Sequence, residues 1–371
     1  MSKFIKRILL ALALLFFLAP IFVFAQNNIS EDIFKAEVTG ILEEREQVGD
    51  DGLVLLQQKV ELESLEGDLK GKKIIFDGLN EFEVVFSHQY KAGDKVLVSR
   101  TQNFEGRDIF YIIDYVRTGK IYFILAVFIL CVIIIARWQG VKSLISLAIS
   151  FLIILYFIIP ILVGSNPLLI SIIGGVGISI AMIYITYGFN KKSSIINLAF
   201  IFSVLLTAFL SLIFTNLTKL SGLAGEESMY LISLGQNVIN LKGLLLAGII
   251  IGTIGVLDDV IVSQVSTVEQ LKKANPSLSV KEIYHRAKKV GTDHISSMVN
   301  TLFFAYAGAS LPLLILFSLK QEPFLAFNQI ISNEIIAVEI VRALVGGISL
   351  ILAVPIANYL ASYLLKIKSY K

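Results

Sequence analysis

Seven long apolar runs, separated by short polar segments, dominate the sequence after residue 119. They cover residues 120–136, 143–163, 168–187, 194–216, 243–266, 295–319 and 338–365. Each run is close to the ~20 apolar residues that a helix needs to cross a bilayer. The pattern therefore predicts an α-helical polytopic membrane domain of seven transmembrane helices over residues 119–371.

The composition agrees with a membrane protein. Hydrophobic residues make up 56% of the 371 residues and charged residues 16%, which is too apolar for a soluble chain of this length. The formal net charge is only +3, and the basic residues gather in short clusters between the apolar runs. We therefore expect the lipid bilayer as a partner and no nucleic acid.

The first 25 residues indicate a signal peptide. Lys3, Lys6 and Arg7 precede an apolar run over 8–19, and small residues before Gln26 suit cleavage by signal peptidase. The alternative is an uncleaved anchor, since residues 8–24 fall just short of the ~18 apolar residues of a spanning helix. We favour cleavage, and both interpretations export the segment that follows.

Residues 26–118 predict a small all-β extracytoplasmic domain. Short segments rich in β-formers are broken by glycine and aspartate turns, and they lie at 34–42, 53–62, 72–76, 95–100 and 107–116. Five strands of this length favour a small closed barrel, for which the OB fold is one candidate. Because the early part is acidic and exported, we expect a structural or docking role and not nucleic-acid binding.

The distribution of charge predicts the orientation in the membrane. Lysine and arginine follow the first, third, fifth and seventh runs, whereas the opposite loops hold few basic residues and also carry Glu226, Glu227, Glu322 and Glu334. Basic loops remain in the cytoplasm. The N-terminal domain is therefore expected outside and the C-terminus in the cytoplasm, which seven helices satisfy.

The residues that usually hold metals are sparse. Cys131 is the single cysteine, and His88, His285 and His294 do not form a spacing such as HExxH. An intrachain disulfide and a thiolate metal site are excluded, and a zinc enzyme is disfavoured. No GxSD-like pattern occurs either, so we expect no cofactor, no metal and no enzymatic activity.

The fifth run carries two adjacent carboxyl groups, Asp258 and Asp259, well inside the apolar segment. An ionisable residue in a membrane helix is a functional candidate by default. At three- and four-residue steps one helix face collects small and polar residues, namely Gly248, Gly252, Gly255, Asp259, Ser263 and Ser266. Small residues allow close helix packing, so Asp259 is expected to point into a helix interface. Asp258 lies about 100° away.

The start of the sixth run and the two residues before it supply polar side chains at a comparable depth, namely Asp293, His294, Ser297, Asn300 and Thr301. If the two helices pack, Asp259 and Ser263 could meet Ser297, Asn300 and Thr301. Asp259 could then exchange protons, with His294 beside Asp293 as a relay, or bind sodium together with the hydroxyl and amide oxygens. The alternative is an aspartate that only locks helix packing.

Two further features flank this pair of runs. Ser279 and Glu282 form a capping-box signature, which predicts a cytoplasmic amphipathic helix over 279–290 that ends at Gly291. Glu339 and Arg342, three residues apart near the outer surface, could form a charge pair inside the bundle. Arg342 could equally extend to the outer interface.

Two segments carry a resemblance to known proteins. With GVLDDVIVSQVSTVEQL at 255–271 and HISSMVNTLFFAYAGASLPLL at 294–314, the chain resembles the YibE/F-like family of multipass bacterial membrane proteins. This resemblance implies a bacterial cell membrane, covers nearly the whole length and implies no activity. The family's name also allows a homologous subunit or a homo-oligomer as a partner.

The same segments are more loosely similar to the central helix pair of the resistance–nodulation–division transporters and the SecD/SecF translocation-motor subunits. In those families acidic residues at this place carry proton or sodium coupling. The resemblance would assign that role to Asp258 or Asp259, with Asn300 or Thr301 nearby. The small exported domain, which precedes all seven runs, departs from their architecture.

We therefore predict an ion-coupled transporter or permease of unknown substrate that uses an intramembrane aspartate. The alternative is a non-transporting assembly or protein-export accessory factor whose exported barrel binds an extracytoplasmic protein.

Overall fold

A computed structural model describes residues 32–48, 54–79, 89–102, 106–162, 164–233, 240–319 and 326–365 of the chain. The expected signal peptide over residues 1–25 and His88 lie outside these residues. The chain divides into two compact units, with the boundary between Ile135 and Ala136. The N-terminal unit holds the strands and the first part of a long helix, and the C-terminal unit is helical.

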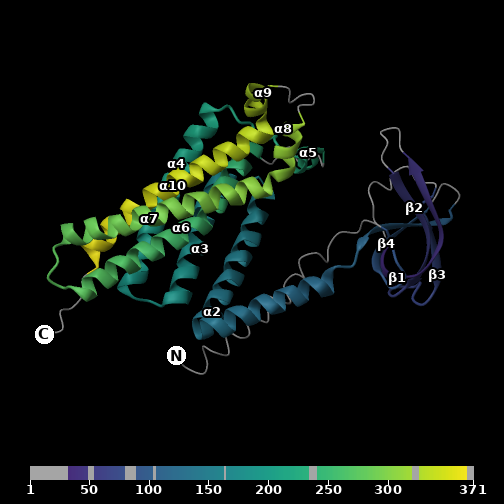
Figure 1. Cartoon of the computed structure of the whole chain (residues 1–371), viewed down its shortest axis with the longest axis horizontal. Helices are drawn as coiled ribbons and strands as arrows, with labels where there is room; N and C mark the ends of the chain where they lie inside the picture. The colour runs from purple at the N-terminus through teal and green to yellow at the C-terminus, as the bar shows by residue number, and fades with distance from the viewer. Residues whose placement is uncertain are drawn as a thin grey trace. The chain divides into compact units, whose positions relative to one another are not determined.

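The N-terminal unit holds one antiparallel sheet of five strands in the order β3-β2-β1-β4-β5. The strands are β1 (Asp32–Val48), β2 (Val54–Ser64), β3 (Lys73–Asp77), β4 (Lys95–Gln102) and β5 (Asp108–Tyr115) (Figure 1). The all-β prediction is confirmed. The first strand is longer than predicted, because β1 pairs with β2 as far as Val48 and Val54 and forms one long hairpin.

Alternating side chains give this sheet its core. Ala36 and Val38 of β1, Val60 and Leu62 of β2 and Val96 of β4 are almost fully buried. Since successive strand residues point to opposite faces, one face of each strand carries the apolar residues. The edge strands β3 and β5 also contact each other, so the sheet curls around its core. The OB-like assignment stays a prediction.

Five helices among the described residues are long and apolar enough to cross a membrane. They are α2 (Thr118–Leu162), α3 (Pro167–Tyr187), α4 (Lys191–Leu217), α6 (Leu241–Ala274) and α10 (Glu334–Leu364). Of the predicted runs, 120–136 lies in α2, as does 143–163 up to Leu162. Its backbone breaks at Arg137, where φ is 51° and ψ is −130°, so α2 consists of two helical segments.

The predicted sixth span, 295–319, is divided between α7 (Val280–Ala309) and α8 (Leu311–Ser318), with Ser310 between them. The expectation that the cytoplasmic helix 279–290 ends at Gly291 was wrong, since α7 continues through that residue to Ala309. A Cβ at Gly291 would come within 2.6 Å of Val354 and 2.7 Å of Gln264. The glycine therefore permits close packing and is not a cap. The count of seven spans stays a prediction.

Helix α6 lies at the centre of the helical unit, where it contacts α3, α4, α7 and α10. Leu257, Ile261 and Val265 on its inner face are fully buried. Figure 1 shows α6, α7 and α10 running side by side. The short helices α5 (Glu226–Ser233), α8 and α9 (Phe327–Ser332) gather at one end of this bundle (Figure 1).

A carboxylate at the start of α10 fixes the loop that follows α4. Glu334 Oε1 accepts hydrogen bonds from the backbone N–H groups of Ser221 at 2.6 Å and Gly222 at 2.9 Å. The Ser221 hydroxyl donates to the same carboxylate at 2.8 Å. Hydrogen bonds to a charged group are stronger than neutral ones, so Glu334 should hold this end of the bundle together.

We predict that Glu334→Gln destabilises the full chain, because an amide replaces the charged acceptor of these bonds. Loss of the charge-assisted bonds should cost about 1–3 kcal/mol. The melting temperature in detergent measures this loss. Glu46→Gln, at an exposed position of β1, is the control and should melt like the parent. Equal melting of both variants and the parent would contradict the assigned role.

Candidate functional site

The two adjacent aspartates of α6 lie in different surroundings. Asp258 is half-buried, and its Oδ1 atom is enclosed and accepts no hydrogen bond from the described part of the chain. Asp259 is exposed, as are Gly248, Gly252 and Gly255 on the same face. The expectation that Asp259 points into a helix interface is therefore not met. Asp258 is the enclosed carboxyl group of the pair.

The large aliphatic residues of α6 explain this difference. Leu257 packs in the core with α4 and α10, and Val260 packs against Leu350 and Val354 of α10. Burying these side chains releases more free energy than burying the glycine face, so α6 turns its aliphatic face inward. Asp258 lies between the two faces and is drawn partly inside. The glycine stripe is a weaker guide to packing here than side-chain volume.

The sixth predicted run does pack against the fifth, and the expected residue Ser263 meets His294 there in place of Ser297, Asn300 or Thr301. The Ser263 hydroxyl and His294 Nδ1 lie 3.2 Å apart, and the tautomer decides which of them donates. A Cβ at Gly252 would also meet the Tyr306 hydroxyl at 3.0 Å. Helices α6 and α7 are therefore adjacent at Gly252 and again at Ser263.

The other polar residues of that run do not complete the predicted cluster. Asp293, Ser297, Asn300 and Thr301 are exposed. Thr301 donates to the backbone oxygen of Ser297 at 3.1 Å, within its own helix. Among the described residues, no hydrogen bond joins Asp259 to Ser297, Asn300 or Thr301. The structure thus brings together Ser263 and His294 and leaves the rest apart.

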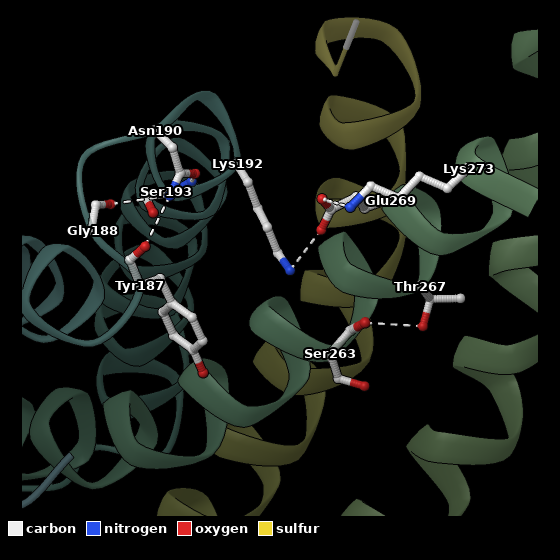
Figure 2. Close-up of polar contacts among 9 residues, drawn as sticks. All are labelled: Tyr187, Gly188, Asn190, Lys192, Ser193, Ser263, Thr267, Glu269 and Lys273. Carbon is white, nitrogen blue, oxygen red and sulfur yellow. Dashed lines mark hydrogen bonds and ion pairs between the residues drawn. The ribbon is translucent and has the colours of Figure 1, made fainter. Parts of the chain in front are cut away.

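Tyr187, at the end of α3, is a site residue that sequence reasoning missed. It lies within electrostatic reach of both Asp258 and Asp259. Figure 2 shows its ring extending from α3 toward the helix that carries Ser263. A tyrosine at the end of a membrane helix is typical of an anchor at the membrane–water interface, so the sequence did not indicate that Tyr187 lies near the aspartates.

An ion-pair network closes the end of the bundle nearest the loop between α6 and α7. Glu269 bonds Lys192 of α4 at 2.8 Å and Lys273 of α6 at 2.7 Å (Figure 2). With a rise of ~1.5 Å per residue, Glu269 lies about 16 Å along α6 from Asp258. On the same side, Ser263 accepts a hydrogen bond at its backbone oxygen from Thr267 at 2.9 Å.

A pair of buried amides joins α6 to α10. Gln264 and Asn358 are both fully buried, and Asn358 donates to Gln264 Oε1 at 3.1 Å. Within the described ranges, the remaining atoms, Gln264 Nε2 and Asn358 Oδ1, lack hydrogen-bond partners. Gln264 and Asn358 are on different helices, so no spacing within one apolar run indicates that they meet, and sequence reasoning missed this pair as well. Gly291 of α7 packs directly onto Gln264.

The predicted cap of α7 forms outside the apolar part of the helix. The Ser279 hydroxyl lies 2.7 Å from Glu282 Oε2, and the Ser279 backbone N–H donates to the same oxygen at 2.8 Å. These bonds hold the pKa of the Glu282 carboxyl below its usual value. The capping-box prediction is confirmed.

The pair of charges on α10 also forms. Arg342 Nη1 lies 3.0 Å from Glu339 Oε1, and about a quarter of each side chain is exposed. Both residues line a cavity at the end of the bundle where α5 and α8 lie. Arg342 therefore turns toward Glu339 and this cavity.

Comparison with known proteins adds a family. A family model described as YibE/F-like protein matches residues 124–367. A search of curated proteins and a search of solved structures found no match.

We predict that Gly291→Ala weakens the contact of α7 with α6 and α10. The added methyl group would overlap Val354 and Gln264, so α7 must shift. The melting temperature should fall, and a Ser263→Cys/His294→Cys pair should cross-link less readily in the variant. Gly308→Ala, on the same helix with open space at its Cβ, is the matched control and should leave both readouts unchanged. Unchanged cross-linking in Gly291→Ala would contradict this packing.

Proposed function

The chain belongs to the YibE/F-like protein family, and we propose that it is an ion-coupled transporter in which Asp258 exchanges a proton or a sodium ion. The observation that carries this proposal is the enclosed Oδ1 of Asp258 on the central helix. The apolar helices of the chain fit a multipass membrane protein. We also propose that this protein lies in the bacterial cell membrane, with the β domain of residues 26–118 outside and the C-terminus in the cytoplasm.

The physical reason is the cost of an uncompensated charge in apolar surroundings. An ionised carboxylate out of water must be neutralised by a proton, a cation or a basic partner. Among the described residues no basic side chain forms an ion pair with Asp258. A proton or a small cation is therefore the neutralising group that we propose.

The neighbouring residues supply a route and a means of coupling. Asp259 is exposed and next in sequence, so it offers an acceptor between Asp258 and the surface. Tyr187 lies within electrostatic reach of both carboxyl groups, and His294 bonds Ser263 one turn further along α6. Since α6 contacts four helices, a change in charge at Asp258 would alter packing across the bundle and shift its conformational equilibrium.

The resemblance to the central helix pair of the resistance–nodulation–division and SecD/SecF proteins supports the same role. In those families an acidic residue at this place couples proton or sodium movement to work. The proposal assigns this role here to Asp258, with Asp259 beside it.

A second candidate function rests on the N-terminal unit. Ile33, Leu42, Ile75 and Ile113 are each 52% exposed on the strand unit. Exposed apolar side chains can contribute to a protein-binding surface where several lie in one patch. In this alternative the exported domain binds an extracytoplasmic protein, and substitution of these residues by aspartate abolishes activity while Asp258→Asn is tolerated.

We predict that dicyclohexylcarbodiimide labels Asp258 in the purified full chain. The carboxyl group gives its proton to a reagent nitrogen, and its oxygen then bonds the central carbon, which leaves an adduct that mass spectrometry detects. The apolar reagent reacts with protonated carboxyl groups in apolar surroundings. The adduct should be present in Asp259→Asn and absent in Asp258→Asn.

Sodium and proton coupling are separated by repeating the reaction in sodium chloride and in choline chloride. Protection by sodium alone assigns the site to sodium, and equal labelling assigns it to the proton. Failure to label Asp258 in either salt, while a labelled standard protein confirms the reagent, would overturn the proposal.

A further inference from the structure

We propose that the cavity beside Glu339 and Arg342 binds a small zwitterion with an apolar tail. The proposal concerns binding at the α5–α8 end of the bundle and does not depend on the role of Asp258. The cavity has a volume of about 440 Å³ and lies between the first turns of α6 and α10, the α7–α8 junction and the segment around Gly222–Ser228. This volume lies in the range of small-molecule sites, roughly 300–1,000 Å³.

The charged groups of the cavity are only partly satisfied. Arg342 Nη1 bonds Glu339, and no hydrogen bond joins the other terminal nitrogen, Nη2, to a described residue. A guanidinium carries five N–H donors in a planar fork that matches a carboxylate. An anionic group entering the cavity can therefore bond Arg342 without displacing Glu339.

The balance of charge favours a ligand that carries both signs. Glu227 and Glu339 line the same cavity as Arg342, so the three ionisable side chains among its described lining residues carry a net charge of −1 when all are ionised. A lone anion would meet two carboxylates, and a lone cation would leave Arg342 Nη2 without a partner. A zwitterion places its carboxylate on Arg342 and its ammonium group near the glutamates.

The walls provide room for an apolar tail. Leu245, Leu313 and Val338 line the cavity between the charged groups. A second cavity of about 200 Å³ shares Ser310, Leu313 and Glu339 with the first, and Phe303, Ile340 and Leu344 line it as well. An aliphatic chain attached to the zwitterionic head can extend past Leu313 into this apolar space, where its burial contributes affinity.

Gly248 keeps the cavity open. An ideal Cβ at this position meets no atom within 4 Å, so a larger side chain fits without disturbing the helix. It would instead occupy the cavity that Gly248 lines. The substitution Gly248→Leu therefore blocks the site and leaves the Glu339–Arg342 pair in place.

Calorimetric titration of the purified full chain tests the proposal. The probes are leucine, 4-methylpentanoate, which lacks the ammonium group, 3-methylbutylamine, which lacks the carboxylate, and glycine, which lacks the tail. Leucine should bind saturably and at least about tenfold more tightly than each of the other three, because each lacks one of the three contacts.

Arg342→Gln and Gly248→Leu should each weaken leucine binding by at least about tenfold, and Arg342→Lys should retain part of it because the positive charge remains. Gly308→Ala is the control for folding and should bind like the parent. Each variant is used only if it melts like the parent without ligand.

A zwitterionic lipid headgroup offers the same chemistry as leucine, so native mass spectrometry examines phosphatidylethanolamine bound to the parent and to Gly248→Leu. Leucine binding assigns the site to a free zwitterion, and retention of the lipid by the parent alone assigns it to a headgroup. Equal behaviour of the parent and Gly248→Leu toward both would overturn the proposal, as would equal affinity for leucine and 4-methylpentanoate.

Discussion

The cost of placing a carboxyl group inside a bundle of apolar helices is the constraint on which the rest of this structure depends. Asp258 lies on the helix that contacts four others, and one of its oxygens is enclosed without a hydrogen bond in the described part of the chain. A membrane offers no water to satisfy such an atom. The large aliphatic residues that bring α6 inward also bring Asp258 in. The free energy gained by burying them offsets the cost of enclosing the carboxyl group.

Close packing around this position depends on a small number of residues that join three helices. Gly291 lets α7 approach Gln264 of α6 and Val354 of α10, and Gln264 bonds Asn358. His294, one turn beyond Gly291, then reaches Ser263. A shift of α6 would alter its contacts with Gly291, His294 and Asn358 together. The enclosed carboxyl group and these contacts therefore lie on the same helix, α6.

Much of the fold was predictable because its elements depend on patterns within short stretches of sequence. Apolar run length located α3, α4, α6 and α10, and alternation located the five strands. Local capping chemistry also predicted the Ser279–Glu282 box. What the sequence could not give was helix rotation and continuity. Gly291 has the signature of a helix end, but its role depends on Val354, which is distant in sequence.

The candidate site shows the same limit. The position of Asp258 and Asp259 inside an apolar run identified both as candidates, but the glycine stripe favoured Asp259. The stripe takes no account of the large buried side chains of Leu257 and Val260 on another face of the helix. Tyr187 and Asn358 meet α6 only through tertiary packing, so no spacing within one helix could reveal them. The Glu339–Arg342 pair was predictable from its i,i+3 spacing, but the cavity beside it was not.

The central claim is that Asp258 binds and releases an ion within the membrane domain, and it can be tested without knowledge of the substrate. Proteoliposomes containing the full chain are adsorbed to a solid-supported membrane and exposed to a rapid jump in proton or sodium concentration. Ion binding at a site within the bilayer displaces charge, so we predict a transient current for the parent chain and its loss in Asp258→Asn. An equal transient current in the parent and in Asp258→Asn would contradict the account.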